Sequence, residues 1–404
     1  MTQPQAITRL SLRNYKSVEL CDLKLERLTL LVGRNGAGKS NIVDALAFVA
    51  DSLRNTLEYA VRKRGGIAQV RRKSSSKPTH PAISVEINLP HGATAKYTFR
   101  IAAVKDPVFR IDYEKCEVRT PAGDRQAFET KNGHVVEWTA QSPPPPASDD
   151  RLYLVAASGL PMFRPVYDAL TAMVFHNLNP QAMKQPLRPE PGTLLSHDGS
   201  NLASVIKQLA TAAPDKLNRV IQYVQALGVP VTEIRHKQSG SFETLEVLQG
   251  NGDDNRPATF DAMALSDGTI RAIGILASLF SVGAEGLAGP TLIGIEEPET
   301  ALHPAAAGAL MDALIEGRSQ TQLLLTCHSP DLLDHSAISP EMVRPTVLVE
   351  GRTRVGVLAP QKAGILKSHL STAGELLRLD QLEPDPDDLR RQEEAKDTLL
   401  EGTP

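Results

Sequence analysis

The sequence lacks the features that mark several large classes of protein. It has only three cysteines among 404 residues, and they show no paired spacing. A sparse and odd set of thiols argues against a disulfide framework or a zinc ribbon and is typical of a reducing cytosol. The N-terminus has no apolar segment of the kind found in signal peptides. We therefore expect a cytoplasmic protein.

Long apolar runs and a strong charge of one sign are also missing. The longest apolar run covers residues 272–282, which is too short to cross a bilayer, so no membrane association is expected. The formal net charge is -3, so overall composition does not indicate nucleic-acid binding and local patches must decide. Sustained heptads are absent as well, which argues against a long coiled-coil arm.

The patterns that are present predict an α/β fold. Apolar or alternating runs predict strands over residues 6–12, 18–25, 28–32, 291–295 and 322–326. The run 28–32 is almost wholly apolar, as expected for a strand buried on both faces. A helix around 305–316 lies between the last two runs, and this strand, helix, strand order indicates a parallel sheet.

A phosphate-binding loop follows the third predicted strand. Residues 33–40, GRNGAGKS, match G-x-x-x-x-G-K-[ST], and helically spaced apolar residues follow from Ile42 to Leu53. Lys39 can reach the β and γ phosphates, and the Ser40 hydroxyl can bind Mg²⁺. We therefore predict ATP and Mg²⁺ as ligands. The expected nucleotide contacts are Gly33, Arg34, Asn35, Gly36, Ala37, Gly38, Lys39, Ser40 and Asn41.

Three glutamates, Glu296, Glu297 and Glu299, follow the predicted strand 291–295. Open α/β sheets bind ligands at the carboxyl ends of their strands. By position, we assign Glu296 to the magnesium ion and Glu297 to the general base that polarises the attacking water. Glu299 can serve as a local cap or hydrogen-bond acceptor. The alternative is an acidic surface loop without a ligand.

A histidine follows the next predicted strand, 322–326. At that strand end, His328 can hydrogen-bond the γ-phosphate or orient the water, so we predict a catalytic role. The alternative is a structural histidine. The neighbouring Cys327 is interpreted as a small buried residue.

A short motif, LSDGT at 265–269, precedes an apolar helix predicted from 269 to 280. Alone it is weak, because a helix cap has the same letters. The motifs occur along the chain in the order NYKSV (14–18), P-loop, LSDGT, IEEPETALHP (295–304) and TCHSP (326–330). This order resembles that of SMC-like and RecF-like ATPases. More closely, the chain resembles stand-alone AAA-type ATPases of bacterial anti-phage defence and DNA repair, which are relatives of the OLD nucleases.

The resemblance implies a homodimer with two ATP molecules sandwiched between the two copies. Ser266 and Gly268, with Asp267 between them, then face the partner's γ-phosphate, and residues 300–303 lie where a loop crosses the interface. The resemblance also implies that Asn14 and Lys16 contact the nucleotide and that Gln69 contacts its Mg²⁺.

The resemblance implies a P-loop NTPase of ABC or SMC-head type, with a mixed sheet, an antiparallel β subdomain and a helical insertion. We expect an N-terminal lobe over 1–140, a mainly helical insertion over 141–255, a C-terminal lobe over 256–350, and an extension with a charged tail over 351–404. The insertion has no room for the long arms of SMC proteins. Transport ATPases have a glycine at the position that corresponds to Asp267 and an aspartate at the position that corresponds to Glu296. Both residues of this chain therefore favour the defence and repair branch.

OLD-type relatives carry a Toprim nuclease after the ATPase. The run 347–351 resembles its opening strand, and Asp385 and Asp387 mimic its acidic pair. Only about fifty residues follow Glu350, too few for a domain of typical size. We therefore expect an edge strand followed by a charged tail.

A basic run lies in a stretch without acidic residues. Its members are Arg62, Lys63, Arg64, Arg71, Arg72, Lys73 and Lys77. They could contact DNA phosphates, and the alternative is a solvated loop. Tyr59 is the one nearby aromatic residue, so base stacking is not indicated.

Together these patterns predict an ATP-hydrolysing enzyme that dimerises on ATP and acts as a sensor or regulator of DNA-associated processes. The main hypothesis is anti-phage defence with an effector, a nuclease or a toxin, encoded nearby. The alternatives are an ATPase-coupled nuclease with a degenerate Toprim-like C-terminus, a RecF-like repair ATPase, and a transporter's nucleotide-binding subunit.

Overall fold

The computed structural model describes residues 5–73, 79–105, 108–148, 150–250, 257–281 and 289–396. The chain forms two compact units. The first comprises Met1–Met173, Ser339–Ser368 and Leu382–Pro404, and the second comprises Val174–Ile338 and His369–Gln381. The four motif-based segments expected from the sequence stay a prediction. Lys77, in the predicted basic run, lies outside the described residues.

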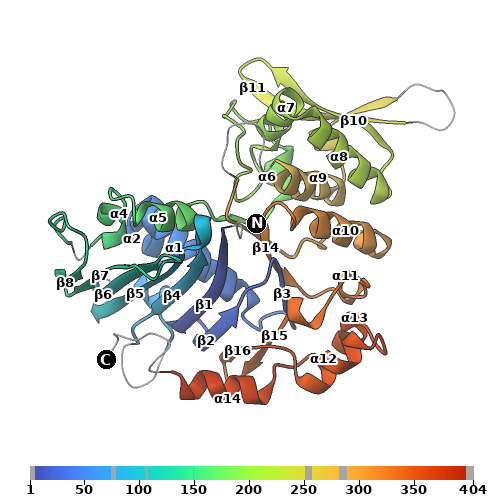
Figure 1. Ribbon diagram of the computed structural model, residues 1–404. Helices are drawn as coiled ribbons and strands as arrows, with labels where there is room; N and C mark the ends of the chain where they lie inside the picture. Colours follow the sequence, from blue (N-terminus) through green and yellow to red (C-terminus); the bar gives the residue numbers. More distant parts are fainter. Residues whose placement is uncertain are drawn as a thin grey trace. The chain divides into compact units, whose positions relative to one another are not determined.

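The first unit is built on a mixed sheet with strand order β8-β7-β6-β5-β4-β1-β2-β16-β15-β3. Its strands are β1 (Ala6–Tyr15), β2 (Val18–Lys24), β3 (Leu28–Val32), β4 (Ala82–Asn88), β5 (Thr94–Lys105), β6 (Val108–Arg119), β7 (Arg125–Lys131), β8 (His134–Trp138), β15 (Val343–Val349) and β16 (Arg352–Val355). Its helices are α1 (Lys39–Arg54), α2 (Leu57–Lys63), α3 (Ile67–Val70), α4 (Tyr153–Ala157), α5 (Arg164–Thr171), α12 (Pro360–Lys367) and α14 (Pro386–Glu394). Helices α1, α2, α4 and α5 gather along one side of the antiparallel strands (Figure 1).

The N-terminal strands form as the sequence predicts. β1 and β2 make an antiparallel hairpin, and every residue of β3 is buried. β15 runs parallel to β3 and antiparallel to β16. Residues 343–345 of β15 pair with β3, whereas the predicted edge stretch, 347–349, pairs with β16.

A buried carboxylate fastens α4 to the antiparallel strands. Glu114 on β6 is 1% exposed. Its oxygens accept hydrogen bonds from the amides of Tyr153 (2.6 Å) and Leu154 (2.8 Å) and from the hydroxyl of Tyr97 (2.9 Å). Burial raises the pKa of Glu114 to about 7, although these hydrogen bonds oppose the shift.

The raised pKa of Glu114 predicts a pH-dependent stability. The contribution is fully present below the unfolded-state pKa, near 4.5, and is lost as pH rises through about 7. The loss is on the order of 3 kcal/mol, because one pKa unit corresponds to about 1.4 kcal/mol. Urea unfolding at pH 5 and pH 8 can measure this loss. The stability advantage of wild type over Glu114→Gln, which cannot titrate, should be smaller at pH 8 than at pH 5.

A neighbouring glutamate provides a control of opposite sign. Burial would raise the pKa of Glu117 on the same strand, but hydrogen bonds from Arg125 and Arg119 outweigh it and lower the pKa. The advantage of wild type over Glu117→Gln should therefore be lost as pH falls. The same sign for both variants would contradict the assignment.

The second unit holds a parallel sheet of order β14-β13-β9 and an antiparallel sheet of order β10-β11-β12. Its strands are β9 (Val174–His176), β10 (Val231–Ser239), β11 (Phe242–Gln249), β12 (Ala258–Asp261), β13 (Leu292–Glu296) and β14 (Gln322–Cys327). Its helices are α6 (Pro180–Lys184), α7 (Leu202–Ala212), α8 (Pro214–Ala226), α9 (Asp267–Phe280), α10 (Ala307–Gly317), α11 (Pro330–Leu333) and α13 (Ala373–Arg378). The predicted parallel pairing of strands is confirmed, whereas β9 was not expected within a helical stretch.

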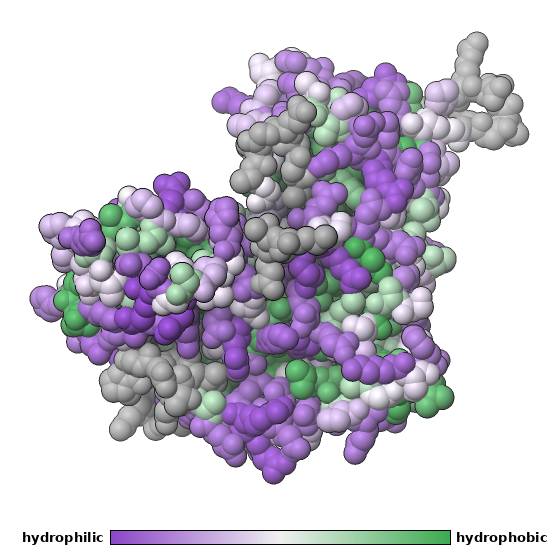
Figure 2. Space-filling view, viewed as in Figure 1, coloured by the Kyte–Doolittle hydropathy of each residue, from purple (hydrophilic) through white to green (hydrophobic). Residues whose placement is uncertain are grey.

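Amphipathic helices cover this second unit. The apolar residues Leu217, Val220 and Val224 of α8 are buried. The outer surface over α8 is mostly hydrophilic (Figure 2). α9 differs, because all residues from Thr269 to Phe280 are buried. This helix therefore lies inside the second unit and carries its N-terminal motif at a fixed place.

The charged C-terminal stretch is helical where the structure describes it. Gln392 on α14 accepts a hydrogen bond from the Asp22 amide and donates one to the Val355 carbonyl oxygen. Residues 386–394 of the predicted extension and charged tail form α14, which contacts β2. No helix in the described part of the chain is long and apolar enough to span a membrane.

Candidate functional site

The P-loop connects β3 to α1 and depends on its glycines. Gly36 and Gly38 have φ values of 81° and 96°, in the region that favours glycine. A Cβ at Gly33 would lie 2.0 Å from the Thr346 carbonyl oxygen, and one at Gly38 would lie 1.9 Å from the Thr353 hydroxyl oxygen. Residues of β15 and β16 therefore pack directly against the loop.

Lys39 is folded back onto this loop. Its Nζ donates to the carbonyl oxygens of Gly33 (2.7 Å) and Arg34 (3.1 Å), and the residue is 5% exposed. Arg34, Asn35 and Ser40 are exposed, so the outer rim of the loop faces solvent. The ammonium group is thus held where an incoming phosphate could replace the two carbonyl oxygens.

A polar network behind the loop was not predicted. The Thr353 hydroxyl donates to the Ala37 carbonyl oxygen (2.9 Å) and pairs with the Ser17 hydroxyl (2.6 Å). The Asn41 amide donates to the same Ser17 oxygen (2.6 Å). Thr353 follows the P-loop by more than three hundred residues, so no local pattern identifies it. The network ties Asn41 to the loop's support, and its predicted nucleotide contact stays a prediction.

The β1–β2 hairpin is fastened to α1 through Asp44. Lys16 Nζ lies 2.5 Å from Asp44 Oδ2, and the Tyr15 hydroxyl donates to the same oxygen. Arg64 donates to Asp44 Oδ1 at 2.8 Å. Burial would raise the pKa of Asp44, but Arg64 and Lys16 outweigh it and lower the pKa. Asn14 and Lys16 both have positive φ, 56° and 47°, which makes the tight turn.

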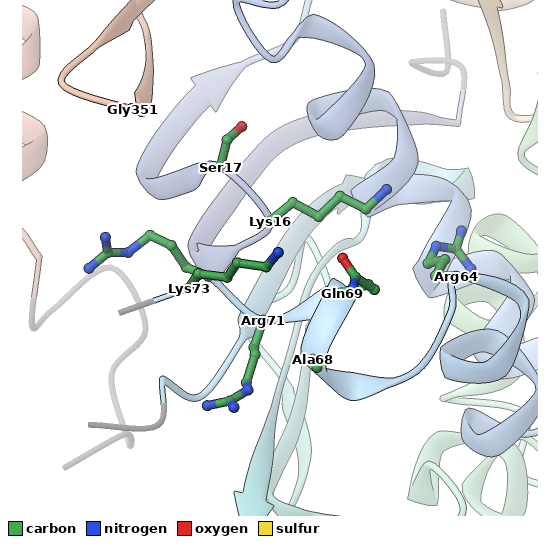
Figure 3. A pocket seen from close by; sticks show the side chains of 9 residues that line it. Lys16, Ser17, Arg64, Ala68, Gln69, Arg71, Lys73 and Gly351 are labelled. Carbon is green, nitrogen blue, oxygen red and sulfur yellow. The ribbon is translucent and has the colours of Figure 1, made fainter. Parts of the chain in front are cut away.

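A pocket of about 510 Å³ lies beside this hairpin. It is lined by Lys16, Ser17, Arg64, Ala68, Gln69, Arg71, Arg72, Lys73 and Gly351. The Lys16 amide donates a hydrogen bond to the Val70 carbonyl oxygen (2.9 Å), which attaches the hairpin to the end of α3 at the edge of the pocket. Figure 3 shows Lys16 and Lys73 extending toward Gln69, while the guanidinium of Arg71 points away. Gln69 is exposed on α3, and its metal role stays a prediction.

Four members of the predicted basic run form ion pairs with acidic residues. The ion pairs are Arg62 with Glu58, Lys63 with Asp51, Arg64 with Asp44 and Asp51, and Arg72 with Glu19. The Arg64 side chain is only 7% exposed. These pairs offset the charge of four side chains, so Arg71 and Lys73 are the better candidates for contact with an anion.

In the second unit, Glu297 stands at the end of a parallel strand in an unusual backbone conformation. β13 pairs with β14, and Glu296 lies opposite Thr326. The φ of Glu297 is 45°, which costs a non-glycine residue about 1–2 kcal/mol. Its amide donates to the carbonyl and hydroxyl oxygens of Thr326, both at 3.1 Å. Its side chain is 37% exposed and can reach a ligand.

Glu299 and His328 complete this strand end. Glu299 Oε1 accepts hydrogen bonds from the amides of His328 (2.9 Å) and Ser329 (3.2 Å), so it serves as the local acceptor that the sequence allowed. His328 Nδ1 lies 3.5 Å from oxygens of both Glu297 and Glu299. The imidazole therefore lies beside the predicted base, although its Nδ1 is buried and makes no hydrogen bond within the described residues. Cys327 is fully buried, consistent with its predicted place as a small core residue.

The LSDGT motif forms the start of α9. Ser266 is the N-cap, and its hydroxyl accepts a hydrogen bond from the Thr269 amide (3.1 Å). A Cβ at Gly268 would lie 2.3 Å from the Ala301 carbonyl oxygen, so only glycine fits there. Asp267 pairs with the buried Lys184 of α6 at 2.6 Å. Lys184 thus balances a carboxylate at a position where phosphate contact is predicted, and the sequence did not indicate it.

Arg271 was also missed. It lies on α9, is 6% exposed, and donates through Nη2 to the carbonyl oxygens of Glu296 (2.9 Å) and Glu297 (3.0 Å). Burial lowers the pKa of Arg271, although the nearby carboxylates, first Glu297, oppose the shift. A single charge within the apolar run 269–280 was the signal that could have found it.

The described residues offer no acidic cluster for a nuclease. Glu350, with φ 51°, lies in the turn between β15 and β16. Asp385 is the N-cap of α14, and its side chain accepts a hydrogen bond from the Asp387 amide. Among the described residues, no three His, Cys, Asp or Glu side chains form a metal-binding group.

Two family models match the chain, one in each unit. Residues 6–114 match the model described as "AAA ATPase domain". Residues 180–334 match the model described as "AAA domain, putative AbiEii toxin, Type IV TA system". These matches cover the P-loop in the first unit and the LSDGT, acidic and histidine motifs in the second.

Two curated proteins are similar to the chain. The Old nuclease of Escherichia phage P2 is 24% identical over 355 residues, which is 81% of this chain and 57% of that protein. Structural maintenance of chromosomes protein 1 of Schizosaccharomyces pombe is 32% identical over 117 residues, which is 27% of this chain and 10% of that protein. The chain therefore spans a little over half of the first relative and a tenth of the second.

Solved structures show the fold. An SmcHead bound to the C-winged helix domain of ScpA has a TM-score of 0.54 at 15% identity and covers 89% of this chain and 99% of its own. The Smc head domain of Pyrococcus furiosus has a TM-score of 0.53 at 12% identity, with coverage of 91% and 99%. The predicted SMC-head fold is confirmed. Together, the two AAA matches, the similarity to the Old nuclease and the SMC-head fold support an SMC-like and RecF-like, ABC-type AAA ATPase related to the OLD family.

Proposed function

We propose that the chain is a Mg²⁺-dependent ATPase in which the P-loop and the acidic strand end act on one ATP. The matches to two AAA family models support ATP hydrolysis. The observation that carries the proposal is the backbone of Glu297, which is held at φ 45° at the end of a parallel strand. Strained backbone of this kind clusters at active sites.

Mg²⁺ fits the oxygen donors of the two motifs. The Ser40 hydroxyl is exposed at the start of α1, and Glu296 is partly exposed at the end of β13. Mg²⁺ is usually held by one or two protein oxygens together with phosphates, so a complete protein cage is not required. Ser40 and Glu296 would hold the ion, with Gln69 as a further candidate. When bound, the ion offsets the negative charge of the phosphates.

The remaining residues have complementary roles in this proposal. Lys39 exchanges the carbonyl oxygens of Gly33 and Arg34 for phosphate oxygens. Glu297 accepts the proton of the water that attacks the γ-phosphate. His328, whose Nδ1 lies 3.5 Å from Glu297, orients that water or donates to the phosphate.

The proposal includes an ATP-dependent homodimer. The N-terminus of α9 carries partial positive charge, and Ser266 and Gly268 stand there. Lys184 offsets the carboxylate of Asp267, which would otherwise repel a phosphate. We therefore propose that this helix end faces the γ-phosphate held by the second copy.

Within the cell, we propose a cytoplasmic sensor or regulator that acts in anti-phage defence with a nuclease or toxin partner. The similarity to the phage Old nuclease supports this place. Absence of such a partner after affinity capture of the tagged chain from its own host would contradict it.

We propose Arg71 and Lys73 for contact with DNA, and binding of DNA should weaken when both are replaced by alanine.

Removal of divalent metal should abolish ATP turnover. We expect EDTA to lower the rate of phosphate release by at least about 100-fold, because most phosphoryl transfer relies on metal charge stabilisation. Excess Mg²⁺ should restore the rate, and thermal unfolding in EDTA checks that the fold persists. Undiminished turnover in EDTA would contradict the proposed use of Mg²⁺.

A further inference from the structure

We infer that Arg271 is a positioning residue that holds Glu297 in its active backbone conformation and connects it to the helix that begins at Ser266. This inference rests on the proposed ATPase function, because it concerns the base of that reaction. It is carried by hydrogen bonds within the second unit.

The guanidinium of Arg271 holds the chain on two neighbouring loops. Nη1 donates to the Leu178 carbonyl oxygen at 2.6 Å, just after β9. Nη2 donates to the carbonyl oxygens of Glu296 (2.9 Å) and Glu297 (3.0 Å) at the end of β13. The planar fork of arginine suits several acceptors at once, and a lysine cannot reproduce it.

Both peptide groups that flank Glu297 are therefore fixed. On its N-terminal side, the Glu297 amide donates to Thr326. On its C-terminal side, the Glu297 carbonyl oxygen accepts from Arg271 and from the Thr300 amide (3.0 Å). These bonds hold the left-handed φ, and the φ in turn sets where the Glu297 carboxylate points.

Stability alone does not account for an arginine at this position. Every residue of α9 from Thr269 to Phe280 is buried, and Arg271 is the one charged side chain among them. Its Nε is buried and has no hydrogen-bond partner within the described residues. A buried charge with an unmet donor is costly, and a well-packed apolar residue is often as stable or more so. What the arginine adds is the placement of three carbonyl oxygens.

The position of Arg271 on α9 gives it a second consequence. Ser266 caps the same helix five residues earlier. A rigid helix transmits a displacement of its N-terminus to Arg271 and so to the carbonyl groups of Glu296 and Glu297. Contact of Ser266 with a phosphate would therefore be felt at the base of the same chain.

The test compares Arg271→Met and Arg271→Lys with a matched control, Arg344→Met. Arg344 is 3% exposed and also donates to backbone carbonyl oxygens, those of Lys24, Glu341 and Val343. Arg344 lies on β15 opposite Leu31 of β3, in the first unit, whereas Glu297 lies in the second. Both arginine losses should lower the melting temperature, so stability alone cannot distinguish them.

Turnover and backbone dynamics should separate the two positions. At a temperature where all variants are folded, we expect kcat of Arg271→Met to fall about 100-fold, as for a misplaced catalytic group, with unchanged ATP affinity. Arg271→Lys should recover only part of kcat. Hydrogen exchange of the Thr300 amide should quicken in Arg271→Met. Arg344→Met should keep wild-type kcat and wild-type exchange at Thr300.

The outcomes separate this inference from the proposed function. Wild-type kcat and wild-type Thr300 exchange in Arg271→Lys and Arg271→Met would overturn the positioning role. Equal losses of kcat in Arg271→Met and Arg344→Met would also overturn it, because a general loss of stability would then explain both. If Glu297→Gln itself hydrolyses ATP normally, the proposed base is wrong, and the exchange result still reports whether Arg271 orders the backbone.

Discussion

Glu297→Gln is expected to bind ATP but to hydrolyse it about 100- to 10,000-fold more slowly, the usual contribution of a general base. Glutamine keeps the size of the side chain and can keep the backbone bonds of Glu297 to Thr326 and Arg271. It cannot accept a proton from water. Because ATP then persists, we expect the dimer to accumulate, and gel filtration with saturating ATP should show a species of twice the mass.

Glu316→Gln is a suitable control for this substitution. Glu316 lies in the same unit, at the end of α10, and pairs with Arg219 at the surface. Its variant should hydrolyse ATP at the wild-type rate. A monomeric Glu297→Gln at saturating ATP would contradict the sandwich, and wild-type turnover would contradict the assignment of the base.

Lys39→Ala is expected to lose ATP binding. The ammonium group would contribute at least two charge-assisted hydrogen bonds to phosphate, each worth roughly 1.5–3 kcal/mol. Their loss corresponds to an increase in Kd of at least about 100-fold. Isothermal titration calorimetry with ATP and Mg²⁺ would measure the change, and turnover should fall below detection at ordinary ATP concentrations.

The control for Lys39 is a lysine far along the chain in the same unit. Lys115 on β6 pairs with Glu129 at 3.2 Å, and Lys115→Ala should bind ATP like wild type. Thermal unfolding of Lys39→Ala establishes that the variant is folded. Retained affinity in a folded Lys39→Ala would show that the loop does not hold phosphates through this residue.

Local patterns predicted the elements that carry the motifs. The apolar run 28–32, the helix after the P-loop and the strands before Glu296 and Cys327 are all present with the expected burial. Each depends on periodicity within a few residues, which a sequence displays directly. The candidate P-loop and acidic strand end could therefore be found from the sequence alone.

The features that the sequence concealed depend on distant partners. β9 has three residues and exists because it pairs with β13, more than a hundred positions later. The charges of Arg64 and Arg72 are balanced by Asp44, Asp51 and Glu19 from other segments. Such long-range contacts leave no periodic signal nearby, so the apparent basic patch could not be discounted before the fold was known.

The tight fit around Gly38 also bears on how distant homologues can be sorted. Because a Cβ there would lie 1.9 Å from the Thr353 hydroxyl oxygen, any larger residue requires the Thr353 side chain to move or to be replaced as well. A homologue that has lost this glycine without a matching change at the threonine has lost the shape of the loop. The residues at these two positions of an alignment can thus distinguish homologues that hydrolyse ATP from homologues that keep the fold without this activity.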